Sequence, residues 1–318
     1  MISKRRRIGW MGWILITLTL LAAALFGFYR YAVATNGVGV LDCADRTFGG
    51  TDGTRVALHD VAYGPLPAQQ LEVIVPAAPA AAKRPVVVFI YGGGWRSGKA
   101  GEYHFIGRTL ARAGYVVVLP GYRLTPDGAF PNMLKDGAAA LHWVHDNIAE
   151  QGGDPDRVFV MGHSAGAYNG MMLTLERQWL GREGVPDGFI KGMIGLAGPY
   201  DFYPFTSDSA REAFGHVADP ATTQPITYVR GDAPPLLLLT GDLDTTVKPR
   251  NSLALAKAMT AVGAPTQAVV LKGVSHESII MKLAQPFMAR DPRVIDAVLA
   301  FLASHGDIAS APVKAREG

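Results

Sequence analysis

The chain has 318 residues, of which 49% are apolar, so one large α/β domain or two small ones can bury a sizeable core. The formal net charge is +3, but five of the 30 basic residues and none of the 27 acidic residues lie within residues 1–34. The remainder therefore holds 25 basic and 27 acidic residues, and this near-neutral body argues against nucleic-acid binding. The single cysteine, Cys43, excludes an intrachain disulfide.

The N-terminus combines a basic cluster, KRRR at 4–7, with an uncharged apolar stretch at 8–29. A helix of that length crosses the ~30 Å hydrocarbon layer of a membrane, and the basic cluster favours the cytoplasmic side. We therefore predict a basic tip and a transmembrane signal-anchor within residues 1–34. Residues 35–318 would form one domain on the extracytoplasmic, or periplasmic, side. A signal peptide cleaved after AVA at 32–34 remains the alternative, and it would make the protein secreted.

Apolar runs of strand length alternate with helical patterns through the rest of the chain. Strands are expected at 71–75, 86–90, 115–119, 157–161, 190–198, 235–240 and 267–272. Helices are expected at 102–113, 132–150, 165–178, 251–262 and 291–305. Several strands are continuously apolar, which is typical of strands covered on both faces. This order predicts an α/β fold with a mainly parallel central sheet and helices on both faces. The proline-rich segment 202–234 is expected to form a small cap insertion over the C-terminal edge of the sheet, where such folds bind ligands.

The segment GHSAG, residues 162–166, places Ser164 between glycines where an apolar strand gives way to a helix. A sharp strand-to-helix turn strains its central residue and brings strand and helix too close together for bulky side chains. The turn would hold the Ser164 hydroxyl above the sheet, facing the first amides of the helix that begins at Ala165. Because G-x-S-x-G also occurs in plain glycine-rich turns, a nucleophilic serine needs catalytic partners elsewhere in the chain.

A serine hydroxyl becomes a good nucleophile only when a base takes its proton. Among the eight histidines, His276 in KGVSHES has the expected position, in a loop after the last strand. His163 adjoins the serine, but its side chain must leave the turn in another direction, so we assign it to packing. A carboxylate must orient the base, and LLLLTGDLDTTV offers two. We expect Asp244, which lies further into the turn, to reach His276; Asp242 is the alternative, or else a turn-forming aspartate.

A run of three glycines, Gly92 to Gly94, follows the strand expected at 86–90. Such a run lets backbone amides approach a substrate oxygen, which is typical of an oxyanion hole. Gly93 to Lys99 also fits most of the phosphate-binding pattern G-x-x-x-x-G-K-[ST], but Ala100 replaces the hydroxyl residue that holds magnesium. We therefore expect no nucleotide or other cofactor. We expect no metal either, because SHES does not match H-E-x-x-H and no cysteine–histidine cluster occurs.

Several motifs together resemble the α/β-hydrolase esterases: YGGGW, GYRLTPDGAFP, GGDPDR, GHSAG, GLAGPYDF, GDLDTTV and GVSH. The likeness runs from about residue 55 to 305 and is greatest to carboxylesterases of the hormone-sensitive-lipase group and to feruloyl esterase-like hydrolases. The order serine, aspartate, histidine is also the order of the α/β-hydrolase triad. The resemblance implies Ser164 as nucleophile, His276 as base and Asp244 as its orienting acid. It further implies the backbone amides of Gly93, Gly94 and Ala165 as oxyanion donors.

One departure concerns Tyr91, which stands where these esterases usually have the histidine of HGGG. That residue props the glycine loop and does not react, so we expect activity to survive. The expected function is a membrane-anchored serine carboxylesterase that cleaves small to medium acyl esters through an acyl-enzyme. An amidase or formamidase with the same triad, and an inactive hydrolase fold that serves as a membrane-tethered binding module, remain alternatives. The sequence leaves the oligomeric state open.

Overall fold

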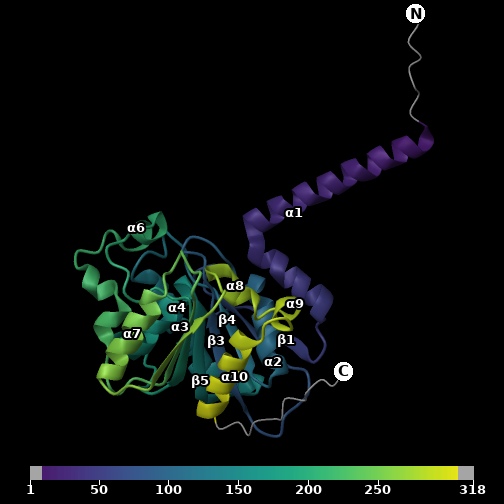
Figure 1. Ribbon diagram of the computed structural model, residues 1–318. Helices are drawn as coiled ribbons and strands as arrows, with labels where there is room; N and C mark the ends of the chain where they lie inside the picture. The colour runs from purple at the N-terminus through teal and green to yellow at the C-terminus, as the bar shows by residue number, and fades with distance from the viewer. Residues whose placement is uncertain (1–8, 307–318) are drawn as a thin grey trace, which may run out of the picture.

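The computed structural model describes residues 9–306, so the basic cluster at 4–7 lies outside the described residues (Figure 1). Within that range, eight strands form one sheet in the order β1-β2-β4-β3-β5-β6-β7-β8. The strands are β1 (Thr54–Ala62), β2 (Gln70–Pro76), β3 (Arg84–Ile90), β4 (Val116–Pro120), β5 (Gly153–His163), β6 (Ile190–Leu196), β7 (Leu236–Gly241) and β8 (Thr266–Leu271). All pairings from β4 to β8 are parallel, whereas β1 pairs with β2 and β2 with β4 antiparallel. The mainly parallel sheet is thereby confirmed.

Helices cover both faces of this sheet (Figure 1). They are α1 (Trp10–Gly49), α2 (His104–Arg112), α3 (Asn132–Asn147), α4 (Ala165–Leu175), α5 (Gln178–Arg182), α6 (Asp208–Phe214), α7 (Arg250–Ala261), α8 (His276–Met281), α9 (Gln285–Met288) and α10 (Arg293–His305). Short 3₁₀ segments are η1 (Ala100–Tyr103), η2 (Ile148–Gln151), η3 (Pro220–Thr223) and η4 (Pro225–Tyr228). Neighbouring residues of β5 point to opposite faces, because Phe159 lies beside Phe301 of α10 and Val160 lies beside Gly170 of α4.

The seven expected strands are all present, as β2 to β8, and the five expected helices correspond to α2, α3, α4, α7 and α10. Strand β1 was missed because its sequence, TRVALHDVA, is half polar. It is the edge strand of the sheet, and its residues are exposed or only half-buried. The short helices α5, α6, α8 and α9 were missed because segments of four to seven residues leave almost no periodic signal. Within the expected cap insertion at 202–234 the chain forms α6, η3 and η4.

The N-terminal helix α1 has two parts, separated by non-helical backbone angles at Asn36. Before Asn36 its large apolar side chains are exposed, and this part projects away from the sheet (Figure 1). After Asn36 it packs against α9, α2 and η1. By length and composition α1 can cross a membrane, a test that an N-terminal signal sequence also passes. The second part was not predicted as helix, because GVGV and the polar DCADR interrupt any apolar periodicity.

A buried ion pair fixes the second part of α1 to the body of the protein. Arg108 of α2 donates from Nε to the Asp45 carboxylate at 2.8 Å and from a terminal nitrogen to Asp42 at 2.7 Å. The Asp45 side chain has no exposed surface, and its other oxygen accepts the backbone N–H of Gln285 at 2.7 Å. Charges at such low exposure are tolerated because each has a partner, so the pair specifies one docking position for α1.

Removal of the Asp45 carboxylate should therefore loosen this docking. We expect Asp45→Ala to lower the free energy of unfolding by about 3 kcal/mol, because the buried guanidinium of Arg108 would keep Asp42 as its only carboxylate partner. Urea unfolding of the full chain in detergent, followed by tryptophan fluorescence, measures the change. Cys43→Ala, an exposed position on the same helix, is the control and should change stability by less than about 0.5 kcal/mol. Equal stabilities of the two variants would contradict a docking role for the pair.

Candidate active site

Ser164 stands between β5 and α4 in strained backbone conformation, with φ 53° and ψ −121°. A positive φ is costly for a residue with a side chain, and it persists where the surrounding structure enforces it. Here the enforcement comes from close packing of the two glycines. A Cβ on Gly162 would lie 2.4 Å from the carbonyl oxygen of Gly166, and one on Gly166 would lie 2.0 Å from that of Ile90. Only glycine fits either position, as the strand-to-helix turn predicted.

His276 lies beside the serine hydroxyl. Its Nε2 is 2.8 Å from Ser164 Oγ, and the ring is largely buried. The sequence placed His276 in a loop; instead it is the first residue of α8, and Ser275 caps that helix by accepting the N–H of Ser278. The correction has a simple cause, since a capped helix of six residues looks like a loop in sequence. The position after the last strand is as expected.

The carboxylate that contacts the base belongs to Asp244. Its Oδ2 is 2.8 Å from Nδ1 of His276, and its Oδ1 accepts the backbone N–H groups of Thr246 and Val247 at 3.0 and 2.8 Å. The Asp244 side chain is fully buried, so these bonds compensate for its desolvation. Because a carboxylate accepts, the hydrogen of the neutral imidazole belongs on Nδ1, which leaves Nε2 free to accept from the serine.

The alternative carboxylate, Asp242, has a different environment. It is exposed, and its Oδ1 accepts the backbone N–H of Gly273 at 2.7 Å. It thus ties the turn after β7 to the turn after β8 and makes no contact with His276. Between the two aspartates the structure favours Asp244 as the partner of the base.

The three expected oxyanion donors border the same cavity as Ser164. Gly93 and Gly94 have φ of 119° and 60°, and a Cβ on Gly93 would lie 2.1 Å from the carbonyl oxygen of Ser97. The loop therefore takes a shape that only glycine permits. Ala165 is the first residue of α4, so its N–H has no acceptor within the helix and is available to a ligand. The positive end of the helix dipole favours negative charge at this point.

The Tyr91 ring packs against the glycine loop and against two other tyrosines. It stacks on Tyr122 and Tyr103 at centroid distances of 4.5 and 5.7 Å, and the Tyr122 hydroxyl donates to the Tyr91 carbonyl at 3.0 Å. The ring also fills the space beside Gly98, where a Cβ would lie 2.7 Å away. An aromatic stack thus holds the loop in place here, and Tyr91 itself has no contact with Ser164.

His163 is buried beside the base. Its Nε2 lies 3.0 Å from the backbone carbonyl of His276, so it donates that hydrogen bond and helps to position the base. Burial, reinforced by the neighbouring imidazole of His276, lowers the pKa of His163 to about 3. The side chain is therefore neutral throughout the neutral pH range. The assignment of His163 to packing agrees with its burial, but sequence reasoning missed the hydrogen bond.

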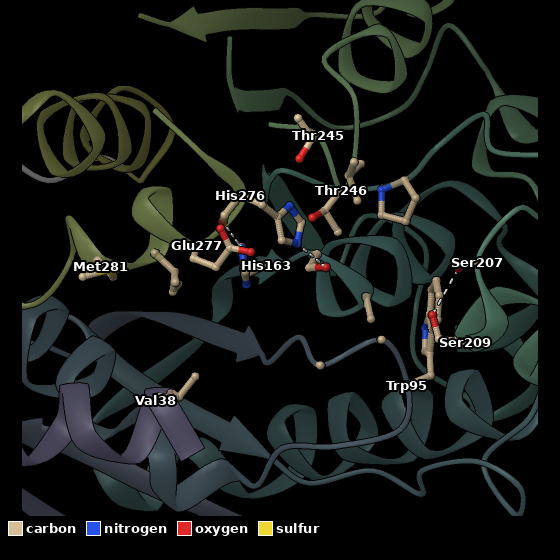
Figure 2. A pocket seen from close by; sticks show the side chains of 18 of the residues that line it. Val38, Trp95, His163, Ser207, Ser209, Thr245, Thr246, His276, Glu277 and Met281 are labelled. Carbon is tan, nitrogen blue, oxygen red and sulfur yellow. Dashed lines mark hydrogen bonds between the residues drawn. The ribbon is translucent and has the colours of Figure 1, made fainter. Parts of the chain in front are cut away.

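One cavity of about 1050 Å³ opens onto Ser164 and His276 (Figure 2). Trp95 and Phe202 border it, whereas Phe105, Tyr122 and Tyr200 are core residues and Phe130 packs on Trp179 and Phe214. Trp95 has φ of +61°, and its Nε1 donates to Asn169 of α4 at 3.1 Å. Sequence reasoning did not find the contribution of α1, eight of whose residues border the cavity. They are Tyr29, Val33, Gly37, Val38, Val40, Leu41, Ala44 and Phe48.

A second group of polar residues lies on β1 and β2, at one edge of the sheet. His59, Asp60 and Glu72 offer ligand atoms within 4.8 Å of one another and could hold a metal ion. The buried Glu72 carboxylate already forms an ion pair with His104, which compensates for its burial. In the sheet, β4 and β3 separate β2 from β5, so this group is remote from Ser164.

The depressed pKa of His163 has a consequence for stability. The unfolded chain binds a proton on this histidine below pH 6.5, whereas the folded protein binds it only near pH 3. The folded state is therefore not penalised for keeping His163 neutral above pH 6.5. Below that pH the unfolded chain gains a proton that the folded protein does not, so the free energy of unfolding falls as the pH is lowered towards 3. We expect the free energy of unfolding to drop by about 2 kcal/mol more between pH 7 and pH 5 in the wild type than in His163→Gln. Denaturant titrations at both pH values test this, and parallel pH dependences would contradict it.

Comparison with known proteins agrees with this architecture. Isoprenylcysteine alpha-carbonyl methylesterase ICME of Arabidopsis thaliana is 27% identical over 249 residues, which covers 70% of this chain and 57% of that protein. Esterase LipQ of Mycobacterium tuberculosis is 28% identical over 229 residues, 65% of this chain and 53% of that protein. The chain thus spans about half the length of the curated relatives it matches.

Among solved structures, esterase B from Lactobacillus rhamnosis superimposes with a TM-score of 0.70 at 20% identity, over 90% of this chain and 97% of that chain. This likeness confirms the predicted α/β-hydrolase fold. A family model described as BD-FAE matches residues 71–259, more than half of the chain. The resemblance to α/β-hydrolase carboxylesterases is confirmed, and the chain belongs to the BD-FAE family.

Proposed function

We propose that the protein is a serine carboxylesterase that cleaves small to medium acyl esters through an acyl-enzyme intermediate. The observation that carries the proposal is the continuous hydrogen-bonded chain from Ser164 Oγ through His276 to the buried carboxylate of Asp244, with 2.8 Å at each step. Nucleophile, base and orienting acid are thus within hydrogen-bond reach of one another. The names of the relatives, a methylesterase and an esterase, support hydrolysis of carboxylic esters.

In the first half-reaction Ser164 Oγ attacks the ester carbonyl carbon while His276 Nε2 takes its proton. Asp244 keeps the imidazole oriented and stabilises the imidazolium that forms. The negative charge on the carbonyl oxygen is stabilised by the N–H groups of Gly93, Gly94 and Ala165. His276 then gives its proton to the leaving alcohol, and the acyl group stays on the serine.

In the second half-reaction water replaces the alcohol. His276 takes a proton from the water, the resulting hydroxide attacks the acyl carbon, and the acid leaves when Ser164 recovers its proton. The strained turn at Ser164 supports both steps because it holds Oγ clear of the backbone, with α4 behind it. No atom of this mechanism requires a metal or an organic cofactor.

We further propose that the first part of α1 is a single-pass signal-anchor and that residues 35–318 form an extracytoplasmic catalytic domain with the cap at 202–234. The apolar, exposed side chains of α1 before Asn36 support the anchor. The orientation follows from the basic cluster at 4–7 by the positive-inside rule. A cysteine-accessibility assay on Cys43, with a membrane-impermeant reagent applied to intact cells, tests the side, because Cys43 is exposed.

Substitution of the nucleophile is the direct test of the reaction. We expect Ser164→Ala to lower kcat on p-nitrophenyl butyrate by a factor on the order of 10⁴ to 10⁶, because the acyl-enzyme can no longer form. A fluorophosphonate probe should label the wild type and leave the variant unlabelled. Folded wild-type protein that takes no label and hydrolyses neither esters nor formyl amides would refute the proposal in favour of a binding module. Turnover of formyl amides alone would favour an amidase.

The two aspartates after β7 form a matched pair for a second test. We expect Asp244→Asn to lower kcat about 10⁴-fold, because an amide cannot hold the imidazole in the productive tautomer. Asp242→Asn, two residues away, should stay within a few-fold of the wild type, because its carboxylate contacts only the Gly273 amide. Both variants are compared in kcat on the same ester after their folding is checked by circular dichroism. Equal losses in the two variants would contradict the assignment.

A further inference from the structure

The cavity at Ser164 has two sides of different chemistry. On one side stand residues of α1, α8 and α9, among them Val38, Leu41, Ile280, Met281 and Phe287. All of these are apolar, and Leu41 and Ile280 are buried in the core. Figure 2 shows Val38 and Met281 on the same side of His276. Glu277 of α8 also borders this side, close to His276. The apolar residues beyond it form an apolar wall that could bind a hydrocarbon chain.

The opposite side of the cavity is more polar, although Phe202, Pro204 and Ala210 of the cap also border it. Its residues come from the cap and from the loop before α7, and they include Ser207, Ser209, Thr246 and Lys248. In Figure 2 Ser207 and Ser209 lie on the other side of His276 from Val38, with Trp95 beside them. A substrate with one apolar and one polar end would therefore have its reacting carbonyl between two matching surfaces.

The apolar wall continues along α1 towards the membrane anchor. Tyr29 and Val33 border the cavity although they precede the break at Asn36, and both are exposed. They belong to the part of α1 that is apolar enough to cross a membrane. The stretch 29–48 is at most about 28 Å long, because a helix rises 1.5 Å per residue. A lipid chain occupies one half of the ~30 Å hydrocarbon layer, so this stretch can accommodate its length.

Docking of the wall is built into the fold. The Asp45–Arg108 pair and the bond from the Asn36 amide to Glu102 hold the second part of α1 beside the cavity. A helix that served only as a tether would need neither contact. Burying the charges of Asp45 and Arg108 costs free energy of desolvation. The ion pair holds α1 where its residues complete the substrate cavity.

We propose that the cavity-lining residues of α1 after Asn36 form the tail-binding wall of this active site, and that its substrate is an ester with a long hydrocarbon chain drawn from the lipid bilayer. These residues are Gly37, Val38, Val40, Leu41, Ala44 and Phe48. This inference rests on the proposed esterase function and extends its substrate class to long chains. The hydrocarbon chain lies between α1 and α8, the ester carbonyl lies at Ser164, and the polar end faces the cap. Helix α1 thereby contributes to substrate specificity as well as to the location of the enzyme at the membrane.

Substitutions that reduce the space beside the apolar wall test this proposal, and the preference of the enzyme for ester chain length is the quantity measured. Val38→Trp and Met281→Trp each place a large ring on the apolar side of the cavity, one from α1 and one from α8. Cys43→Trp adds the same ring at an exposed position of α1 that does not border the cavity. Full-length proteins in detergent are assayed on two series, p-nitrophenyl esters from acetate to palmitate and acetate esters of alcohols from ethanol to hexadecanol. The two series show whether the chain belongs to the acid or to the alcohol.

In at least one series, Val38→Trp and Met281→Trp should lower the ratio of long-chain to short-chain kcat/KM by roughly tenfold for every two methylenes that the ring excludes. Cys43→Trp should keep the wild-type ratio. Wild-type ratios in both cavity variants and in both series would overturn the inference. If one variant fails to fold, the other decides, because the two positions belong to separate helices. Failure of the esterase proposal would look different, since the wild type itself would then hydrolyse no ester.

A vesicle assay tests the source of the substrate. The wild type is reconstituted into phosphatidylcholine vesicles, and p-nitrophenyl palmitate is placed either in the same vesicles or in separate ones. Delivery from the bilayer predicts an initial rate at least about tenfold higher when enzyme and ester share a vesicle. Equal initial rates would overturn delivery from the bilayer.

Discussion

The carbonyl oxygen of Ile90 lies only 2.0 Å from where a Cβ on Gly166 would stand, and this close approach of β3 to α4 governs the whole site. Because the helix begins so near the sheet, the chain must turn sharply at Ser164 and accept a positive φ there. The strain is enforced by the packing of β3, α4 and the buried second half of β5, residues 158–163. The same geometry directs the first amide of α4 at the space above the serine.

Around this turn, each polar group at the site is held by a second contact. Asp244 accepts two backbone amides in addition to the histidine, and His163 holds the backbone of His276 from behind. Tyr91 supports the glycine loop through stacking, where a histidine is the usual residue of this motif in the esterases that the chain resembles. Reactive groups buried in this way need no reorganisation during the proposed reaction, which is the main source of electrostatic catalysis.

In these proposals the N-terminal helix has two roles, membrane attachment and substrate binding. Its first part is exposed and apolar, and its second part is fixed by the Asp45–Arg108 pair beside the cavity. With the proposed tail-binding wall, the break at Asn36 marks the point where a hydrocarbon chain passes from lipid to protein. A domain boundary drawn at residue 34 then divides the anchor from the body but leaves part of the substrate site at the very start of the body.

The sequence by itself determined the parts of this protein that depend on local chemistry. The apolar runs predicted β2 to β8, and G-x-S-x-G predicted the turn at Ser164, because only glycine tolerates the contacts made there. It also predicted His276 as the candidate base, from its position after the last strand. Tertiary structure alone decided what depends on distant groups. It distinguished Asp244 from Asp242 by the direction in which each turn faces, and it brought α1 to the cavity through a charge pair between residues 63 positions apart. No local pattern records such a pairing, because its free energy arises only when the helix and the body are already in contact.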